Sequence, residues 1–196
     1  MSQPPFLSEN EIHRLLSQQA IMGEYPWMSE DQKMVESHFK RTLAEVTRST
    51  KTESRVEWDH YGSGYASFVD VWLYKATPEF RCRTFKRKML PGEEGYTGLV
   101  ILLSRLSPCF VFMEGEKQWH PRGSSSYMPD LDRLDRLETP AVATLAEQVQ
   151  PILERHALIR VSRAQLETPL AAGIHPPTIL TDRGFTQFDA LFYWED

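Results

Sequence analysis

Alternation of apolar and polar residues fills the middle of the chain, whereas apolar residues at helical spacing are confined to its two ends. Between residues 52 and 119, β-rich runs follow one another with only turn residues between them. This pattern predicts strands over residues 52–61, 65–75, 80–89, 96–107 and 109–119. Because strands occupy the middle and helices the ends, we expect an α+β fold, an antiparallel β-meander sheet covered by N-terminal and C-terminal helices.

The predicted strands differ in which face is apolar. In the second strand, Val69, Val71 and Leu73 form an aliphatic face, and Phe68, Asp70 and Trp72 form the other. We expect the aliphatic face to point into the core and the face with Asp70 to point away from it. Residues 99–103 are apolar on both faces, which is typical of a central strand. The predicted core therefore includes Val69, Val71, Leu73, Leu99, Ile101 and Leu103. Residues 81–88 are basic and indicate a solvated strand, with a nucleic-acid surface as the sharper alternative.

Two amphipathic helices precede the strands. Ser8 and Glu11 have the spacing of a capping box, so the first helix should begin there and end before Gly23 and Pro26. The same pattern recurs at residues 29–32, and apolar residues then recur every three or four positions, which predicts a second helix to about Thr47. We expect both helices to lie on the sheet.

The region after the meander reads as loop, helix, strand and short helix. Residues 121–129 contain a glycine and three serines and predict a surface loop. Thr139 and Pro140 predict the start of a helix that runs to His156, and Pro151 should kink or interrupt it. Residues 158–161 predict a short strand, residues 162–165 a short helix, and residues 185–194 a closing strand.

Composition limits the class of protein without naming an activity. The 196 residues, 41% hydrophobic and 25% charged, suit one folded domain spanning residues 1–196. The net charge of −5 is opposite to the positive charge that nucleic-acid binding requires, and it favours a basic partner. No secretion signal or 18-residue apolar run is present, so we expect no membrane contact. Cys82 and Cys109 fall in predicted strands and indicate buried free thiols, hence a reducing, cytoplasmic compartment.

The sequence contains no recognisable catalytic or cofactor-binding motif. The histidines lack the spacing of metal ligands, and Gly62-Ser63-Gly64 joins two strands where a nucleotide-binding loop would join a strand to a helix. Residues 130–138 hold several acids, but apolar residues at every third position favour a short amphipathic helix or turn. We therefore predict no metal, no cofactor and no catalytic residue.

Aromatic and acidic residues recur together near the predicted hairpin around Gly62-Ser63-Gly64. Aromatic anchors bordered by charges are common in protein interfaces, and an acidic rim would attract a basic partner. The predicted partner-binding residues are Glu57, Asp59, His60, Tyr61, Tyr65, Asp70 and Trp72. Two other interpretations stay open: the aromatic residues fill the core, and Tyr61 and Tyr65 form a cross-strand pair that closes the hairpin.

The order of elements, from a helical N-terminal region through an antiparallel meander to a C-terminal helix and closing strand, resembles bacterial immunity proteins of polymorphic toxin systems. This resemblance implies a cytoplasmic, non-enzymatic module that binds a cognate toxin and occludes its active site. It assigns no individual residue. The alternative function is a small-ligand-binding protein or an enzyme with an unrecognised pocket.

Overall fold

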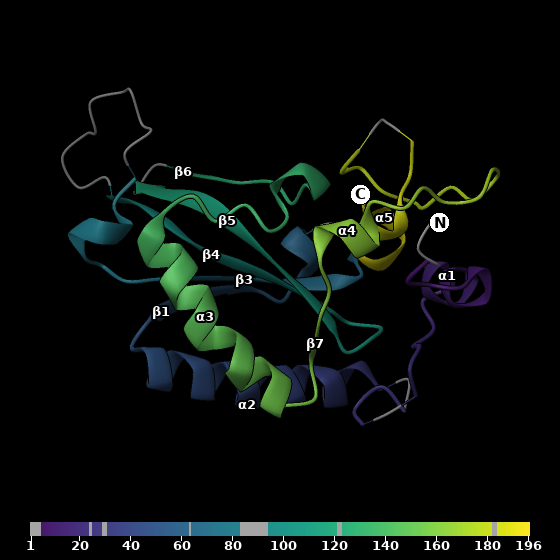
Figure 1. Cartoon of the computed structure of the whole chain (residues 1–196), viewed down its shortest axis with the longest axis horizontal. Coiled ribbons are helices and arrows are strands. Elements are labelled where there is room, and N and C mark those ends of the chain that lie inside the picture. The colour runs from purple at the N-terminus through teal and green to yellow at the C-terminus, as the bar shows by residue number, and fades with distance from the viewer. Residues whose placement is uncertain are drawn as a thin grey trace.

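A central antiparallel sheet organises the structure, a computed structural model that describes residues 5–23, 25–28, 31–62, 64–82, 94–120, 123–181 and 184–196. The strands lie in the order β1-β3-β4-β5-β6, all with antiparallel neighbours, and β7 pairs with β5 in parallel (Figure 1). Their bounds are β1 Glu53–Glu57, β3 Phe68–Tyr74, β4 Glu94–Ser104, β5 Cys109–His120, β6 Gly123–Ser126 and β7 Ile159–Arg160. The predicted α+β class with a mostly antiparallel sheet is confirmed.

The core lies where the sequence predicts it. The strand β4, apolar on both faces, is the central strand of the sheet. All six predicted core residues are completely buried, namely Val69, Val71, Leu73, Leu99, Ile101 and Leu103. At about 25 cal/mol for each Å² of apolar surface removed from water, this burial is the main stabilising contribution to the fold.

The prediction that only one face of the second strand is buried is wrong. Every residue of β3 is buried, including Asp70, which is 3% exposed, and Trp72, which is not exposed at all. The face that carries them is covered in part by C-terminal aromatic residues, since the ring of Phe68 packs against that of Phe192. The sheet therefore has apolar layers on both sides, and neither Asp70 nor Trp72 is at the surface.

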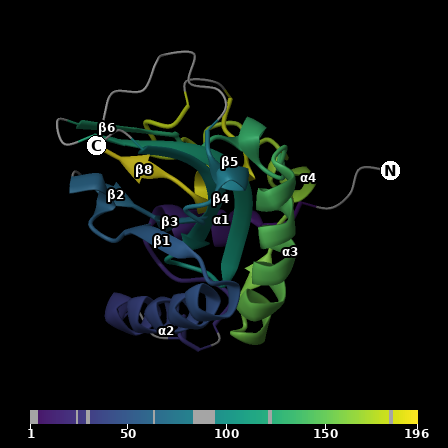
Figure 2. The same cartoon turned by 90° about the vertical axis from the view of Figure 1, so that its left-hand side faces the viewer.

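Two long helices cover one face of the sheet. The helix α2 (Gln32–Thr50) packs beside α3 (Pro140–Arg155), and the two lie against the same side of the sheet (Figures 1 and 2). The first helix, α1 (Glu9–Leu16), begins with the predicted capping box of Ser8 and Glu11. It packs on the C-terminal helix α5 at one end of the sheet, so the prediction that both N-terminal helices lie on the sheet holds for α2 and not for α1.

The C-terminal region contains the short helices α4 (Arg163–Leu166) and α5 (Gln187–Leu191) and the strand β8 (Trp194–Glu195). The predicted closing strand 185–194 is therefore a helix over Gln187–Leu191, and a strand begins only at Trp194. Thr186 and Asp189 form a capping box, which favours a helix despite the aromatic residues that follow. Pro151 does not interrupt α3, which continues through it to Arg155.

Two other predicted segments differ from the structure where it describes them. At the start of the predicted strand 80–89, Phe80 ends a 3-10 helix and Arg81 forms an isolated bridge with Tyr96. Residues 83–89 of the predicted strand lie outside the described residues. The predicted loop 121–129 contains the strand β6 and the buried Tyr127. Within the part of the chain that the structure describes, no helix is long and apolar enough to cross a membrane.

The two ends of the described chain are hydrogen-bonded to each other. The amide of Leu7 donates to the side-chain oxygen of Gln187 over 3.0 Å, and the Gln187 side chain donates back to the Leu7 carbonyl over 3.2 Å. The hydroxyl of Tyr193 donates to the Leu15 carbonyl over 3.0 Å. These bonds fix α1 and the segment before it against the C-terminal region.

Candidate functional site

The predicted hairpin around Gly62 is replaced by a longer connection with a strand of its own. Strands β1 and β3 pair from Glu53↔Tyr74 to Glu57↔Asp70, so their connection runs from residue 58 to residue 67. Within it, β2 (Tyr65–Ala66) leaves the main sheet and pairs with β8, opposite Glu195 and Trp194. We call residues 57–66 the bridging segment because it joins the main sheet to the C-terminal strand.

The bridging segment holds an unusual backbone conformation. His60, Tyr61 and Gly62 have φ angles of 53°, 58° and 77°, so three consecutive residues lie in the left-handed region. For a residue with a side chain this conformation costs on the order of 1–3 kcal/mol and persists only where the surroundings enforce it. One such restraint is Glu57, whose Oε1 accepts the amides of Asp59 and Tyr61 over 2.9 and 3.2 Å.

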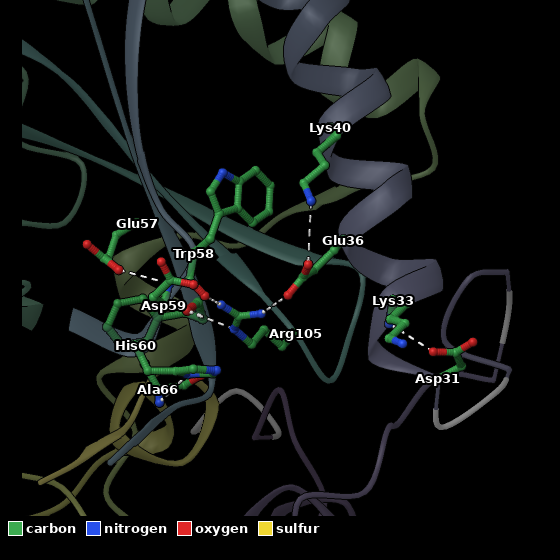
Figure 3. A network of polar contacts seen from close by, with 11 residues as sticks. Asp31, Lys33, Glu36, Lys40, Glu57, Trp58, Asp59, His60, Ala66 and Arg105 are labelled. Atoms are coloured by element: carbon green, nitrogen blue, oxygen red, sulfur yellow. Dashed lines mark hydrogen bonds and ion pairs between the residues drawn. The ribbon is translucent and has the colours of Figure 1, made fainter. Parts of the chain in front are cut away.

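A second restraint is the buried guanidinium of Arg105, which lies on the connection between β4 and β5 (Figure 3). Its Nη2 donates to the Trp58 carbonyl over 2.6 Å and its Nε donates to the Phe68 carbonyl over 3.3 Å. Its Nη1 makes an ion pair with Glu36 of α2 over 3.1 Å. A planar fork of donors suits this arrangement, since one side chain satisfies acceptors on three elements.

The indole of Trp58 is half-buried beside α2. The Nζ of Lys40 lies 5.0 Å from the centre of its ring, within the range of a cation–π contact, and Lys40 also pairs with Glu36 over 3.6 Å. Asp59, the next residue, is exposed. Lys40, Trp58 and Asp59 therefore form a surface that mixes charge with aromatic area, and Figure 3 shows them around Arg105 and Glu36.

The imidazole of His60 holds the bridging segment together through contacts within it. Its Nδ1 lies 2.9 Å from the amide nitrogen of Ala66 and 3.2 Å from the carbonyl oxygen of the same residue. Its ring stacks on Tyr65, with the centroids 5.3 Å apart. Burial lowers the pKa of His60 below its ordinary value, and the charge of Arg105 lowers it further. The neutral imidazole, with Nδ1 accepting the Ala66 amide, is thus the favoured form near neutral pH.

The two tyrosines of the predicted site do not form a cross-strand pair. The ring of Tyr61 packs 4.3 Å from that of Trp194, and its hydroxyl donates to Asp70 over 2.8 Å. Tyr65 is opposite Glu195 in the β2–β8 ladder and packs against Tyr193. Burial raises the pKa of the Tyr65 hydroxyl to about 12. Both side chains therefore act mainly as attachments of the bridging segment to the rest of the molecule.

Asp70 is the buried acceptor beneath this segment. Besides the Tyr61 hydroxyl, it accepts the hydroxyl of Tyr127 over 2.5 Å. Burial raises the pKa of Asp70, whereas the Tyr127 hydrogen bond and the charge of Lys117 act in the opposite direction. Burial also raises the pKa of Tyr127 well above its ordinary value. The carboxyl group thus joins the bridging segment, β3 and the residue that follows β6.

The structure separates the predicted partner-binding residues into two groups. Asp70 and Trp72 are buried, and the Trp72 indole donates to the Gly115 carbonyl over 3.0 Å. The other five lie together on the bridging segment, and of these only Asp59 is exposed. The residues of this group are Glu57, Asp59, His60, Tyr61 and Tyr65.

Glu36 and Lys40 on this surface, and the buried Arg105 beneath it, are absent from the predicted set. One of them has a signal in the sequence, since Arg105 is a single charged residue beside the apolar run 99–103. A lone cation in such a position is expected to be buried with partners. Glu36 and Lys40 occupy ordinary polar positions of a helix, and only tertiary packing brings them to the bridging segment.

A separate cavity of about 560 Å³ opens where β4 and β5 meet the first turn of α3. Its acidic lining includes Glu79, Glu114, Glu116 and Glu138, with Arg81 as the basic member. Glu114 accepts the amide and the hydroxyl of Thr139 over 2.8 and 2.7 Å. A strand residue therefore satisfies the start of α3, where Thr139 makes no capping bond of its own.

Other kinds of chemistry find little support in the described residues. Among them, no three histidine, cysteine, aspartate or glutamate side chains come together as metal ligands. The predicted cluster at 130–138 contains a 3-10 helix at Leu131–Arg133. Cys82 is partly buried and Cys109 fully buried, both as free thiols, and burial raises the pKa of each to about 11. Neither thiol is activated as a nucleophile.

Comparison of the chain with models of protein families, with curated proteins and with solved structures gives no match.

Proposed function

We propose that this protein is a non-enzymatic binding module that docks a protein partner on the bridging segment and the adjoining face of α2. The carrying observation is the pre-organised backbone of residues 58–62, in which His60, Tyr61 and Gly62 are left-handed and which Glu57 and Arg105 restrain. A loop that is already ordered loses less entropy on binding than a flexible one. Strained backbone that the surroundings maintain is also concentrated at functional sites.

The chemistry of this surface favours a basic partner. Asp59 is exposed, and Glu36 and Glu57 lie nearby with partly exposed carboxylates. Arg105 is buried and paired, and the exposed Lys40 pairs with Glu36, so the three acids outnumber the two cations on and beneath this surface. With a net charge of −5 for the chain, long-range attraction also acts on a positively charged protein.

The partner that we propose is a cognate toxin, which the module would neutralise by occluding a basic catalytic cleft. This proposal rests on the resemblance of the element order to bacterial immunity proteins and on the charge of the surface. An immunity protein acts by affinity alone, so a rigid acidic surface is sufficient for the task. The compartment would then be the cytoplasm, where a toxin must be neutralised.

Asp59→Lys is the variant that tests the surface. Its side chain is exposed, so the change reverses a charge without disturbing the contacts of the bridging segment. Glu147→Lys is the matched control, because Glu147 is an exposed acid on α3. We expect Asp59→Lys to lower the affinity for the partner by roughly tenfold or more, mainly through slower association, and Glu147→Lys to leave it unchanged.

The experiment begins with purification of the native protein with its bound partner from the source cells, followed by calorimetry with each variant. Co-expression with the partner then shows whether the module restores growth, and an excess of the partner shows whether inhibition is stoichiometric. If Asp59→Lys and Glu147→Lys bound the partner with the same affinity, the interface would lie elsewhere on the protein. A partner that is turned over by the protein, or growth that is not restored, would contradict neutralisation.

A second candidate function is binding of a small cationic ligand, which the acidic cavity beside α3 favours. Four glutamates with one arginine would suit an amine or guanidinium group. A thermal-shift screen with polyamines and guanidinium compounds separates the two functions. A saturable rise in Tm for the wild-type protein that Glu138→Gln abolishes and Asp59→Lys retains would favour the cavity.

A further inference from the structure

We propose that His60 is a proton-operated latch that closes the bridging segment when its imidazole is neutral and loosens it when the ring is protonated. The latch itself follows from the geometry of this chain. Its consequence for a partner rests on the proposed function, because loosening matters to binding only if the partner docks on this segment.

The first observation is the position of Nδ1 between the two polar groups of one peptide residue. Nδ1 lies 2.9 Å from the Ala66 nitrogen, at a distance suited to accepting its N–H, and 3.2 Å from the Ala66 oxygen. A ring nitrogen accepts when it is unprotonated and donates when it carries a proton. Protonation of Nδ1 therefore removes the acceptor of the Ala66 amide and turns Nδ1 into a donor that faces the Ala66 carbonyl oxygen instead.

The second observation is what this single contact spans. Residues 60 and 66 are the two ends of the part of the bridging segment that contains Tyr61 and Gly62, both left-handed. The imidazole also stacks on Tyr65, so it contacts strand β2 at a second point. Release of Nδ1 from Ala66 thus weakens the junction between the left-handed turn and the β2–β8 ladder.

The third observation is the charge that surrounds the ring. Arg105, from the connection between β4 and β5, opposes a positive imidazole, whereas Glu36 of α2 and Asp59 of the same segment favour it. From β2 the neighbour is Tyr65, whose own nearby charges are Arg105 and Glu195. Burial and Arg105 outweigh the hydrogen bond to Ala66 and the two carboxylates, so the pKa of His60 lies below that of an unfolded histidine.

The sign of the effect follows from this shift. A histidine whose pKa is lower in the folded state than in the unfolded state binds fewer protons when folded. Its contribution to the local stability is complete above the unfolded pKa of about 6.5 and is lost as the pH falls through the folded pKa. The latch is therefore closed at pH 7.5 and loosens under mildly acidic conditions.

Hydrogen exchange of the Ala66 amide tests the latch without a partner. In the wild-type protein we expect the protection factor, corrected for intrinsic exchange, to fall on the order of tenfold between pH 7.5 and pH 5.0, as expected for one lost hydrogen bond. The amide of Ile101 on the central strand should stay protected at both pH values. Proportional losses at both amides would mean global unfolding and would overturn the latch.

His60→Asn is the control variant, because asparagine can replace the hydrogen bond of the imidazole but does not titrate. The Asn side-chain oxygen can accept the Ala66 amide, and asparagine tolerates a φ angle near 53° better than most residues. We expect Ala66 protection in this variant to be the same at both pH values, and His175→Asn, which changes an exposed histidine, to behave as wild type. A fall in His60→Asn as large as in the wild type would overturn the proposal.

A measurement on the wild-type protein alone covers the case in which His60→Asn does not fold. The ring-proton NMR signals of His60 give its pKa, and the midpoint of the Ala66 protection curve must coincide with it. Different midpoints would refute the latch. Failure to find a protein partner would leave these results unchanged, whereas a confirmed partner whose affinity does not respond to pH would refute only the functional consequence.

Discussion

Arg105→Lys should destabilise the protein by about 2–4 kcal/mol while keeping the positive charge. The guanidinium makes three contacts, to the carbonyls of Trp58 and Phe68 and to the carboxylate of Glu36. A lysine ammonium cannot present donors in that fork, so about two of the three contacts are lost. At about 1.5–3 kcal/mol for each hydrogen bond of a charged group, the loss is at most about 3–6 kcal/mol. Water that enters beside the half-buried Trp58 replaces some of the lost hydrogen bonds, so the expected net loss of stability is about 2–4 kcal/mol.

Urea unfolding, followed by tryptophan fluorescence and circular dichroism, measures this change. The matched control is Arg155→Lys, since Arg155 pairs with Glu45 over 2.8 Å but its side chain is 60% exposed. We expect that control to cost less than about 1 kcal/mol. A loss below about 1 kcal/mol for Arg105→Lys, or equal losses for the two variants, would refute the idea that Arg105 restrains the bridging segment.

Two further predictions concern the core and the bridging segment. Ile101→Ala should lower the free energy of unfolding in urea by roughly 2–5 kcal/mol because Ile101 is fully buried, and Ile179→Ala, at a side chain that is 51% exposed, should cost far less. Gly64→Ala should lower the Tm, because the added Cβ would lie 2.0 Å from the Glu195 carbonyl oxygen at a φ of +47°, whereas Gly184→Ala meets open space and should leave the Tm nearly unchanged.

Local patterns in the sequence predict the main sheet but not the bridging segment. The alternation of Val69, Val71 and Leu73 and the apolar run 99–103 identify the core strands because burial follows residue spacing. The pairing of Tyr65 with Glu195 joins positions far apart in the chain, and no local pattern reports such a pairing. A glycine loop between two β-rich runs therefore suggested a tight hairpin where the chain forms a third strand.

The candidate site shows the same limit at the level of single side chains. Asp70 has the sequence context of a surface acid between aromatic residues, but Tyr61 and Tyr127 bury it with two hydrogen bonds. Capping chemistry could have corrected one error, since the Thr186 and Asp189 spacing indicates the helix α5 within a run that reads as a strand. Arg105 shows that a lone cation beside an apolar run is worth assigning to the interior.

The hydrogen bonds between Leu7 and Gln187 mean that α1 can dock only late in the synthesis of the chain. These residues lie 180 positions apart, so α1 cannot take its native place until nearly the whole chain has left the ribosome. Until then, the apolar side chains of Ile12 and Leu15 have no C-terminal region to pack on. Closing so long a loop is slow, because its entropic cost precedes the contacts that reward it. The nascent chain therefore carries the apolar side chains of Ile12 and Leu15 uncovered during most of its synthesis, and such exposed side chains are the kind of surface that chaperones bind.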